Sequence, residues 1–315
     1  MKKIILTAII IIASCIFANA QESERTLFPS GTYMYVQRDT CDLFLDVYYA
    51  TQGSETCYNG KAKPTVLFIF GGGFYEGQRD KPYYMKWFRQ LTDNGHNVVS
   101  IDYRLGLKGV KGMGIGQVNA LDKAIHMAVE DLFSATNFLL ENGDALGIDA
   151  NNMIVSGSSA GAITSLQAEY EICNRTEWAQ VLPEDFNYVG VMSFSGAIFS
   201  RKGKIKFSHR EPCPVLMLHG TADKIVNYNQ TVFANLGFFG SHQIAKRFEK
   251  YGCNYNIWRF KDNGHEIASS MGETWYMQEP FIKFNVMDGQ QRILDALLDT
   301  PQIEKTTGSL KEMYN

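Results

Sequence analysis

Two common metal-binding patterns are missing from this sequence. It has no Cys-x-x-Cys and no His-Glu-x-x-His spacing, so it predicts no metal site, and we expect no cofactor. Basic residues are also few, with 30 Lys and Arg against 33 Asp and Glu, and they form no basic stripe. The resulting net charge of -3 argues against a nucleic-acid partner.

The sequence also lacks a linker rich in Pro, Gly or Ser, an internal repeat and a block of like charges. Because such features divide chains into domains, their absence favours one domain, which we place at residues 21–287, with a tail over residues 288–315. With 315 residues, 45% of them hydrophobic, the chain can bury a large core. The oligomeric state stays open.

The apolar run at the N-terminus, residues 4–12, is too short for a comfortable membrane span. Two lysines precede it and Ala18-Asn19-Ala20 follows it, which predicts a signal peptide over residues 1–20 and a periplasmic or secreted protein. A lipoprotein anchor at Cys15 is the alternative. We favour cleavage, because Ile16 and Phe17 continue the apolar region where a lipoprotein would turn polar.

Five cysteines remain after the signal peptide, an odd number for an oxidising compartment. We expect one or two disulfides and a free thiol, with the pairing open. The five are Cys41, Cys57, Cys173, Cys213 and Cys253.

Short apolar runs alternate with segments of helical periodicity, which predicts a mostly parallel sheet with helices on both faces. The predicted strands are residues 65–70, 97–101, 153–156, 189–195, 215–218 and 256–260, after a hairpin over 32–49. The predicted helices include residues 118–140, a segment with Val232, Phe233, Leu236, Ala245 and Phe248, and a tail with Ile293, Ala296 and Leu297. Residues 106–116 are predicted to be a glycine-rich surface loop.

Gly157-Ser158-Ser159-Ala160-Gly161 has the form G-x-S-x-G between an apolar run and a helix-compatible run. That context is expected of a nucleophile elbow, a strained turn that pushes the hydroxyl of Ser159 outward. The alternative is an ordinary Gly/Ser turn, because the pentapeptide alone is a weak signal.

A serine nucleophile needs a base to remove its proton and an acid to hold that base. Asp223 follows one predicted strand and His265 follows the last clear one, in the order Ser, Asp, His. Asp262 is the main rival for the acid and Glu266 a weaker one. His219 precedes Asp223, which is the wrong order, so we interpret it as a structural residue near the acid loop.

Three glycines follow the first buried strand, where backbone N–H groups could face a substrate. Gly72 and Gly73, with the N–H of Ala160, are therefore the predicted oxyanion hole. A flexible turn is the alternative. Among the aromatic residues that could line a cleft, Tyr75 beside the glycines is the best substrate-binding candidate.

Several motifs recur in order: Phe70-Gly71-Gly72-Gly73-Phe74, Asp102-Tyr103-Arg104, Ala128-Val129-Glu130-Asp131, the Ser159 pentapeptide, Asp223 and Gly264-His265. Together they resemble the α/β-hydrolase esterases of the hormone-sensitive-lipase and carboxylesterase type, including secreted bacterial acetyl-xylan and feruloyl esterase-like members. The resemblance implies an α/β-hydrolase fold, the triad Ser159, Asp223 and His265, and a bracing role for Asp102-Tyr103-Arg104. One departure is Phe70, where the family has a histidine; the resemblance implies that this position braces the oxyanion loop.

The residues predict a serine carboxylic-ester hydrolase that acts through an acyl-enzyme. The absence of a lid-length hydrophobic insertion favours short acyl groups, such as acetyl or feruloyl, on a small-molecule or polysaccharide ester. A serine peptidase of the prolyl-oligopeptidase kind is one alternative, although there is no room for a propeller before the first strand. A non-catalytic binding protein on a hydrolase fold is the other.

Overall fold

The computed structural model describes residues 27–110, 115–233, 235–299 and 303–305. The strands are β1 (Gly31–Arg38), β2 (Cys41–Tyr48), β3 (Cys57–Tyr58), β4 (Lys61–Ala62), β5 (Thr65–Ile69), β6 (Val98–Ile101), β7 (Met153–Ser158), β8 (Gly190–Phe194), β9 (Ala197–Ser200), β10 (Val215–Gly220), β11 (Gln230–Phe233), β12 (Leu236–Gly240), β13 (Tyr255–Phe260) and β14 (Ile293–Leu298). The helices are α2 (Pro82–Asp93), α3 (Ile115–Asn142), α4 (Ala160–Asn174), α5 (Ser241–Tyr251) and α6 (Trp275–Pro280). Shorter helical segments are η1 (Asp144–Leu146), η2 (Glu177–Val181), η3 (His265–Ser269) and the π-helical η4 (Phe281–Met287).

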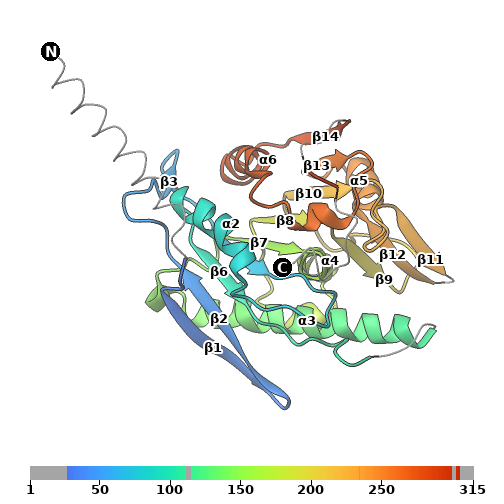
Figure 1. Cartoon of the computed structure of the whole chain (residues 1–315), viewed down its shortest axis with the longest axis horizontal. Coiled ribbons are helices and arrows are strands. Elements are labelled where there is room, and N and C mark those ends of the chain that lie inside the picture. The colour runs from blue at the N-terminus through green and yellow to red at the C-terminus, as the bar shows by residue number, and fades with distance from the viewer. Residues whose placement is uncertain (1–26, 111–114, 234, 300–302, 306–315) are drawn as a thin grey trace, which may run out of the picture.

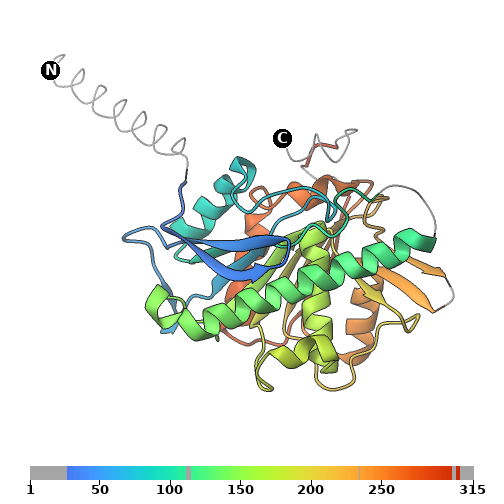
Figure 2. The ribbon, with the colours of Figure 1, turned by 90° about the horizontal axis from the view of Figure 1, so that it is seen from below.

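A nine-stranded sheet forms the centre of the molecule, in the order β1-β2-β6-β5-β7-β8-β10-β13-β14 (Figure 1). The pairs β1–β2 and β2–β6 are antiparallel, and every pair from β6 to β14 is parallel. Helices lie on both faces, with α3 and α4 together on one side and α2 on the other (Figure 2). The predicted α/β class and mostly parallel sheet are therefore confirmed.

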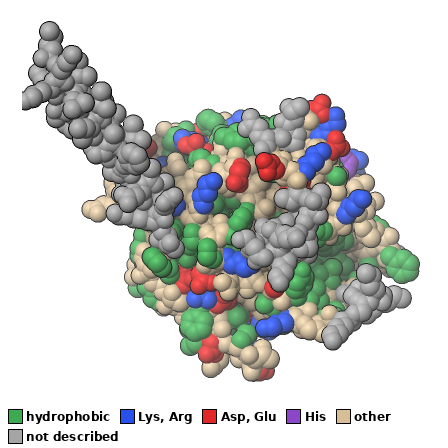
Figure 3. Space-filling model, in the orientation of Figure 1, with side chains coloured by type: hydrophobic (Ala, Val, Ile, Leu, Met, Phe, Trp, Pro, Cys, Tyr) green, Lys and Arg blue, Asp and Glu red, His purple; other side chains and the backbone are tan. Residues whose placement is uncertain are grey.

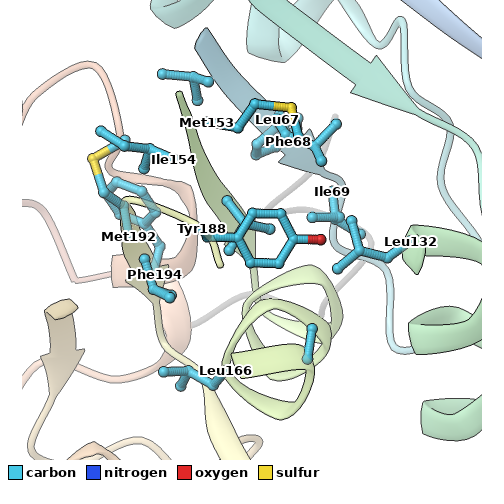
Figure 4. Close-up of a cluster of buried hydrophobic side chains, with 14 of the residues drawn as sticks. Leu67, Phe68, Ile69, Leu132, Met153, Ile154, Leu166, Tyr188, Met192 and Phe194 are labelled. Carbon is cyan, nitrogen blue, oxygen red and sulfur yellow. The ribbon is translucent and has the colours of Figure 1, made fainter. Parts of the chain in front are cut away.

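The middle strands are buried along their whole length, because helices cover both of their faces. Every residue of β5, β7 and β8 is buried, which explains why these strands consist mostly of apolar and small residues. Figure 4 shows Phe68 and Ile69 of β5 with Ile154 of β7 and Phe194 of β8 in this core. The site described below is built on this rigid centre.

The segment predicted as one helix with Val232, Phe233 and Leu236 is a hairpin followed by a helix. β11 and β12 pair antiparallel, and β12 also pairs with β9, a short strand that the sequence did not reveal. Helix α5 begins only at Ser241. The prediction was wrong because the partner strand β9 is distant in sequence, so a local periodicity cannot show it.

The tail prediction also needs correction. Ile293, Ala296 and Leu297 lie in strand β14, which pairs parallel with β13 at the edge of the main sheet. Backbone pairing with β13 makes this segment a strand despite its helical spacing. The main sheet therefore continues beyond residue 287.

No disulfide joins the five cysteines of the described chain, contrary to the predicted one or two bridges. Cys41 and Cys57 are exposed, and the other three are buried. The thiol of Cys173 donates a hydrogen bond to Glu169 Oε1 over 3.2 Å. Burial raises the pKa of the Cys253 thiol to about 11.

Some predictions fall on residues outside the described chain. The signal peptide, with Cys15, is one of them, and residues 111–114 of the predicted glycine-rich loop are another. Helix α3 begins at Ile115, a few residues before the predicted start at Val118. In the part of the chain that the structure describes, no helix is both long and apolar enough to cross a membrane.

Gly161 marks the closest approach of helix α4 to strand β5. A Cβ at this position would lie 2.0 Å from the carbonyl oxygen of Ile69, which is backbone and cannot move aside. We expect Gly161→Ala to lower the free energy of unfolding by about 3 kcal/mol or more, measured by urea denaturation. Gly272→Ala is the matched control, because its Cβ would meet only Gln90 Oε1 at 4.0 Å. Equal stability of the two variants would contradict this account.

Candidate active site

Ser159 lies in the tight turn between β7 and α4. Its backbone has φ 51° and ψ −113°, a conformation that is strained for a residue with a side chain. Glycines on both sides make the turn possible, since a Cβ on Gly157 would lie 2.2 Å from the carbonyl carbon of Gly161. This strand–turn–helix geometry is that of a nucleophile elbow.

Three side chains predicted from distant parts of the sequence form one hydrogen-bonded chain. Ser159 Oγ lies 2.7 Å from His265 Nε2, and His265 Nδ1 lies 2.7 Å from Asp223 Oδ2. All three are buried, with relative exposures of 2%, 3% and 5% for Ser159, His265 and Asp223. With the proton on Nδ1, the imidazole donates to Asp223, and Nε2 accepts from the serine hydroxyl.

The carboxylate of Asp223 is held by four donors. The N–H groups of Ile225 and Val226 donate to Oδ1, over 2.9 and 3.0 Å. His219 Nε2 lies 3.2 Å from Oδ2, the oxygen that also faces His265. Burial on its own raises the pKa of Asp223, but the hydrogen bonds from His219 and His265 outweigh it and hold the pKa well below its ordinary value.

His219 is fixed in one orientation behind the acid. Its Nε2 also lies 2.9 Å from the carbonyl oxygen of Val226, so this nitrogen carries the proton. Its Nδ1 lies 2.8 Å from Ser241 Oγ, and the serine hydroxyl can donate there. The sequence interpretation of His219 as a structural residue near the acid loop agrees with these contacts.

The two rival acids do not share a hydrogen bond with His265 in the described structure. Asp262 is exposed, and its N–H donates to Thr221 Oγ1. Glu266 is buried, but its Oε1 accepts from Asn263 Nδ2 and from the N–H of Gly264. Glu266 thus holds the shape of the loop that carries the histidine.

Known proteins share this fold and parts of this sequence. The family model BD-FAE matches residues 45–172. Thermogutta terrifontis esterase 2 phosphorylated by paraoxon superposes with a TM-score of 0.54 over 81% of this chain and 96% of that one, at 16% identity, which shows the fold. The chain has the α/β-hydrolase fold.

Among the sequence relatives are proteins named as esterases. Esterase E4 of Myzus persicae is 33% identical over 137 residues, which are 43% of this chain and 22% of that protein. Esterase LipI of Mycobacterium tuberculosis is 33% identical over 107 residues, 34% of this chain and 28% of that protein. The chain thus spans less than a third of the length of either relative. The resemblance to α/β-hydrolase esterases is confirmed.

The glycine loop makes a tight turn beside Ser159. Gly72, Gly73 and Phe74 all have positive φ, at 122°, 63° and 62°. The N–H groups of Tyr75 and Glu76 donate to the carbonyl oxygen of Gly72, which closes the turn.

A cavity lies beside Ser159, and only some of the predicted oxyanion donors line it. Gly73 and Ala160 line this cavity, whereas Gly72 shapes the turn and does not. Ala160 is the first residue of α4, where an N–H has no acceptor within the helix. Gly73 and Ala160 are thus the better placed pair for an oxyanion hole.

Aromatic contacts replace the family histidine at Phe70. Its ring stacks on that of Tyr103, with the centroids 4.4 Å apart, and the hydroxyl of Tyr103 donates to the carbonyl oxygen of Phe70. The N–H of Gly71 donates to the hydroxyl of Tyr84 over 3.1 Å. The loop is therefore braced by packing and by these two hydrogen bonds.

The Asp102-Tyr103-Arg104 segment is a structural brace, as the resemblance implies. Asp102 Oδ2 pairs with Arg79 over 2.6 Å and accepts from the N–H of Phe44. Arg104 pairs with Asp131 of α3, which is fully buried. These contacts tie the end of β6 to β2 and α3.

A cavity of about 640 Å³ opens beside Ser159. Tyr75, the predicted substrate-binding residue, is not among its lining residues; its ring lies next to Gly73 instead. More than half of the lining comes from residues 224–238, which the sequence analysis did not assign to the site. The sequence of this segment contains apolar residues such as Ile225 and Phe233, which are exposed in the structure. These residues were the available signal that the segment belongs to the site.

Within the described chain, no group of three or more His, Cys, Asp or Glu side chains is arranged to hold a metal ion. The chemistry available at this site is that of a buried hydroxyl, an imidazole and a carboxylate in a row. Such a row can transfer a proton away from the hydroxyl as it attacks.

Asp223 makes the stability of the protein depend on pH. Since its pKa is lower in the folded than in the unfolded chain, its ionised form stabilises the fold above about pH 4, and this contribution is lost as the pH falls further. We expect Asp223→Asn to lower the free energy of unfolding by about 2 kcal/mol at pH 7. The difference from the wild type should shrink below pH 4. Asp262→Asn, at an exposed site, should show neither effect.

Proposed function

We propose that this chain is a serine carboxylic-ester hydrolase that acts through an acyl-enzyme. The observation that carries the proposal is the continuous hydrogen-bonded row from Ser159 through His265 to Asp223, at 2.7 Å for each contact. The esterase relatives and the BD-FAE match support the same activity.

In the proposed reaction, Ser159 Oγ attacks the ester carbonyl while His265 Nε2 takes the hydroxyl proton. Asp223 holds the imidazole in the Nδ1–H tautomer and stabilises its positive charge. The N–H groups of Gly73 and Ala160 bind the oxyanion of the tetrahedral intermediate, with Gly72 as the third predicted contributor through the turn. His265 then gives its proton to the leaving alcohol, and water releases the acid by the reverse steps.

The acyl groups proposed are those of acetyl or feruloyl esters on carbohydrate. Support for this class comes from the resemblance to secreted bacterial acetyl-xylan and feruloyl esterase-like proteins. Export belongs to the same proposal, supported by the signal-peptide pattern of residues 1–20. Release of acetate or ferulate from acylated oligosaccharides, compared with simple methyl esters, tests the substrate class.

The nucleophile can be tested by one substitution. We expect Ser159→Ala to lower kcat for p-nitrophenyl acetate by at least about a thousandfold and to abolish labelling by a fluorophosphonate probe. Ser156→Ala is the matched control: this buried serine lies on β7, the strand that leads into Ser159, and its hydroxyl has no hydrogen-bond partner among the described residues. Control turnover should stay close to the wild type.

Two results would contradict the proposal. Equal turnover by the wild type and Ser159→Ala would remove Ser159 from the chemistry. Cleavage of peptidyl arylamides in preference to esters would favour a peptidase.

A further inference from the structure

A small sheet in the order β11-β12-β9 stands beside the nucleophile. Its pairing places Thr231 opposite Phe238 and Phe238 opposite Phe199, so these side chains share one face. Phe233 pairs with Leu236 and lies two residues after Thr231, which puts it on the same face. All five residues line the cavity. One face of the sheet is therefore a wall of the site.

The opposite side of the cavity is also apolar. Val118 and Leu121 of α3 and Ile163 of α4 line it. Among the described residues that line the cavity, three side chains besides that of Ser159 are polar. At about 30 Å³ for a water-sized group, 640 Å³ has room for roughly twenty such groups. An acetyl group would leave most of this wall in contact with water.

The hairpin exposes its apolar side chains at the mouth of the cavity. Phe233 lines the cavity and is nevertheless 71% exposed, and its neighbour Val232, on the other face, is 44% exposed. All four residues of β11 are exposed. Figure 3 shows hydrophobic side chains gathered on the side of the molecule where this sheet lies in Figure 1. Exposed apolar surface beside a cavity marks a place where a ligand binds.

We propose that the ester hydrolysed at this site carries an apolar group far larger than acetyl, such as an alkyl chain of roughly eight carbons. This group lies against the wall formed by β9, β12 and β11, and Phe233 covers its outer end. The inference rests on the proposed ester hydrolysis and revises its substrate class. It replaces the preference for the shortest acyl groups, because the hairpin supplies the apolar insertion that the sequence did not reveal.

The two neighbouring hairpin residues, Phe233 and Val232, allow a matched test. We expect the wild type to have a higher kcat/KM for p-nitrophenyl octanoate than for p-nitrophenyl acetate. Phe233→Ser should lower this octanoate-to-acetate ratio about tenfold, because less apolar surface leaves water when the chain binds. Val232→Ser, on the same strand but the opposite face, should leave the ratio unchanged. Both residues are exposed, and a melting curve checks that each variant folds.

Two outcomes would overturn the inference. One is a wild type that prefers p-nitrophenyl acetate and also hydrolyses octyl acetate no faster than methyl acetate. The other is an equal change of the octanoate-to-acetate ratio in both variants. Turnover of acetate with no gain from a long acyl or a long alcohol part would leave the proposed function intact and remove only the substrate class.

A binding measurement tests the inference without turnover. Calorimetry of methyl octanoate with Ser159→Ala protein should show binding that Phe233→Ser weakens about tenfold and Val232→Ser does not. Absence of binding would overturn the inference, whatever the enzyme assays show. If methyl octanoate binds as expected but no ester is hydrolysed, the result would instead contradict the proposed function.

The apolar group could be the acyl or the alcohol part of the ester, and two further substrates distinguish them. Faster hydrolysis of methyl octanoate than of methyl acetate assigns the group to the acyl part. Faster hydrolysis of octyl acetate than of methyl acetate assigns it to the alcohol. No gain from either long ester would contradict the proposal.

Discussion

The close contact between helix α4 and strand β5 is the constraint on which the site depends. With Gly161 lying against the backbone of Ile69, α4 begins directly behind the end of β7 and leaves only one residue, Ser159, for the turn. The strained φ of that residue persists because β5, β7 and β8 are buried along their whole length and cannot relax. The strain directs the hydroxyl away from the sheet, toward the loops that carry the histidine and the acid.

A similar close contact brings the base and the acid together. β10 and β13 are parallel neighbours, so the loops after them leave the sheet at the same edge. A Cβ on Gly220 would lie 2.2 Å from the carbonyl oxygen of Gly264, which shows how tightly the two loops pack. Asp223 then receives two backbone N–H groups and two imidazoles. Because these donors converge on it, the buried carboxylate stays ionised. Its negative charge stabilises the imidazole when the imidazole accepts a proton.

The parts that the sequence predicted and the parts that it did not differ in physical origin. The buried strands, Ser159, Asp223 and His265 were predictable because a strand covered on both faces is apolar throughout, and because polar residues that follow such strands meet at one edge. The hairpin β11–β12 and strand β14 were not, since their partners β9 and β13 lie far along the chain and their residues also fit helical spacing. The sequence shows that Phe70 replaces the family histidine. It cannot show that the ring of Phe70 stacks on Tyr103, because this is a tertiary contact.

The proposed catalytic residues and the proposed substrate-binding wall lie on different sheets. Ser159, His265 and Asp223 are attached to the parallel sheet, where a small displacement would disturb many buried contacts. The apolar wall stands on a separate three-stranded sheet, whose outer strand β11 is exposed along its length and pairs on one side only within the described chain. Changes in that hairpin can alter the size and polarity of the cavity without moving Ser159, because β11 does not belong to the sheet that strains the turn. An exposed hairpin beside a rigid core is therefore a position where substrate preference can change while the catalytic geometry stays fixed.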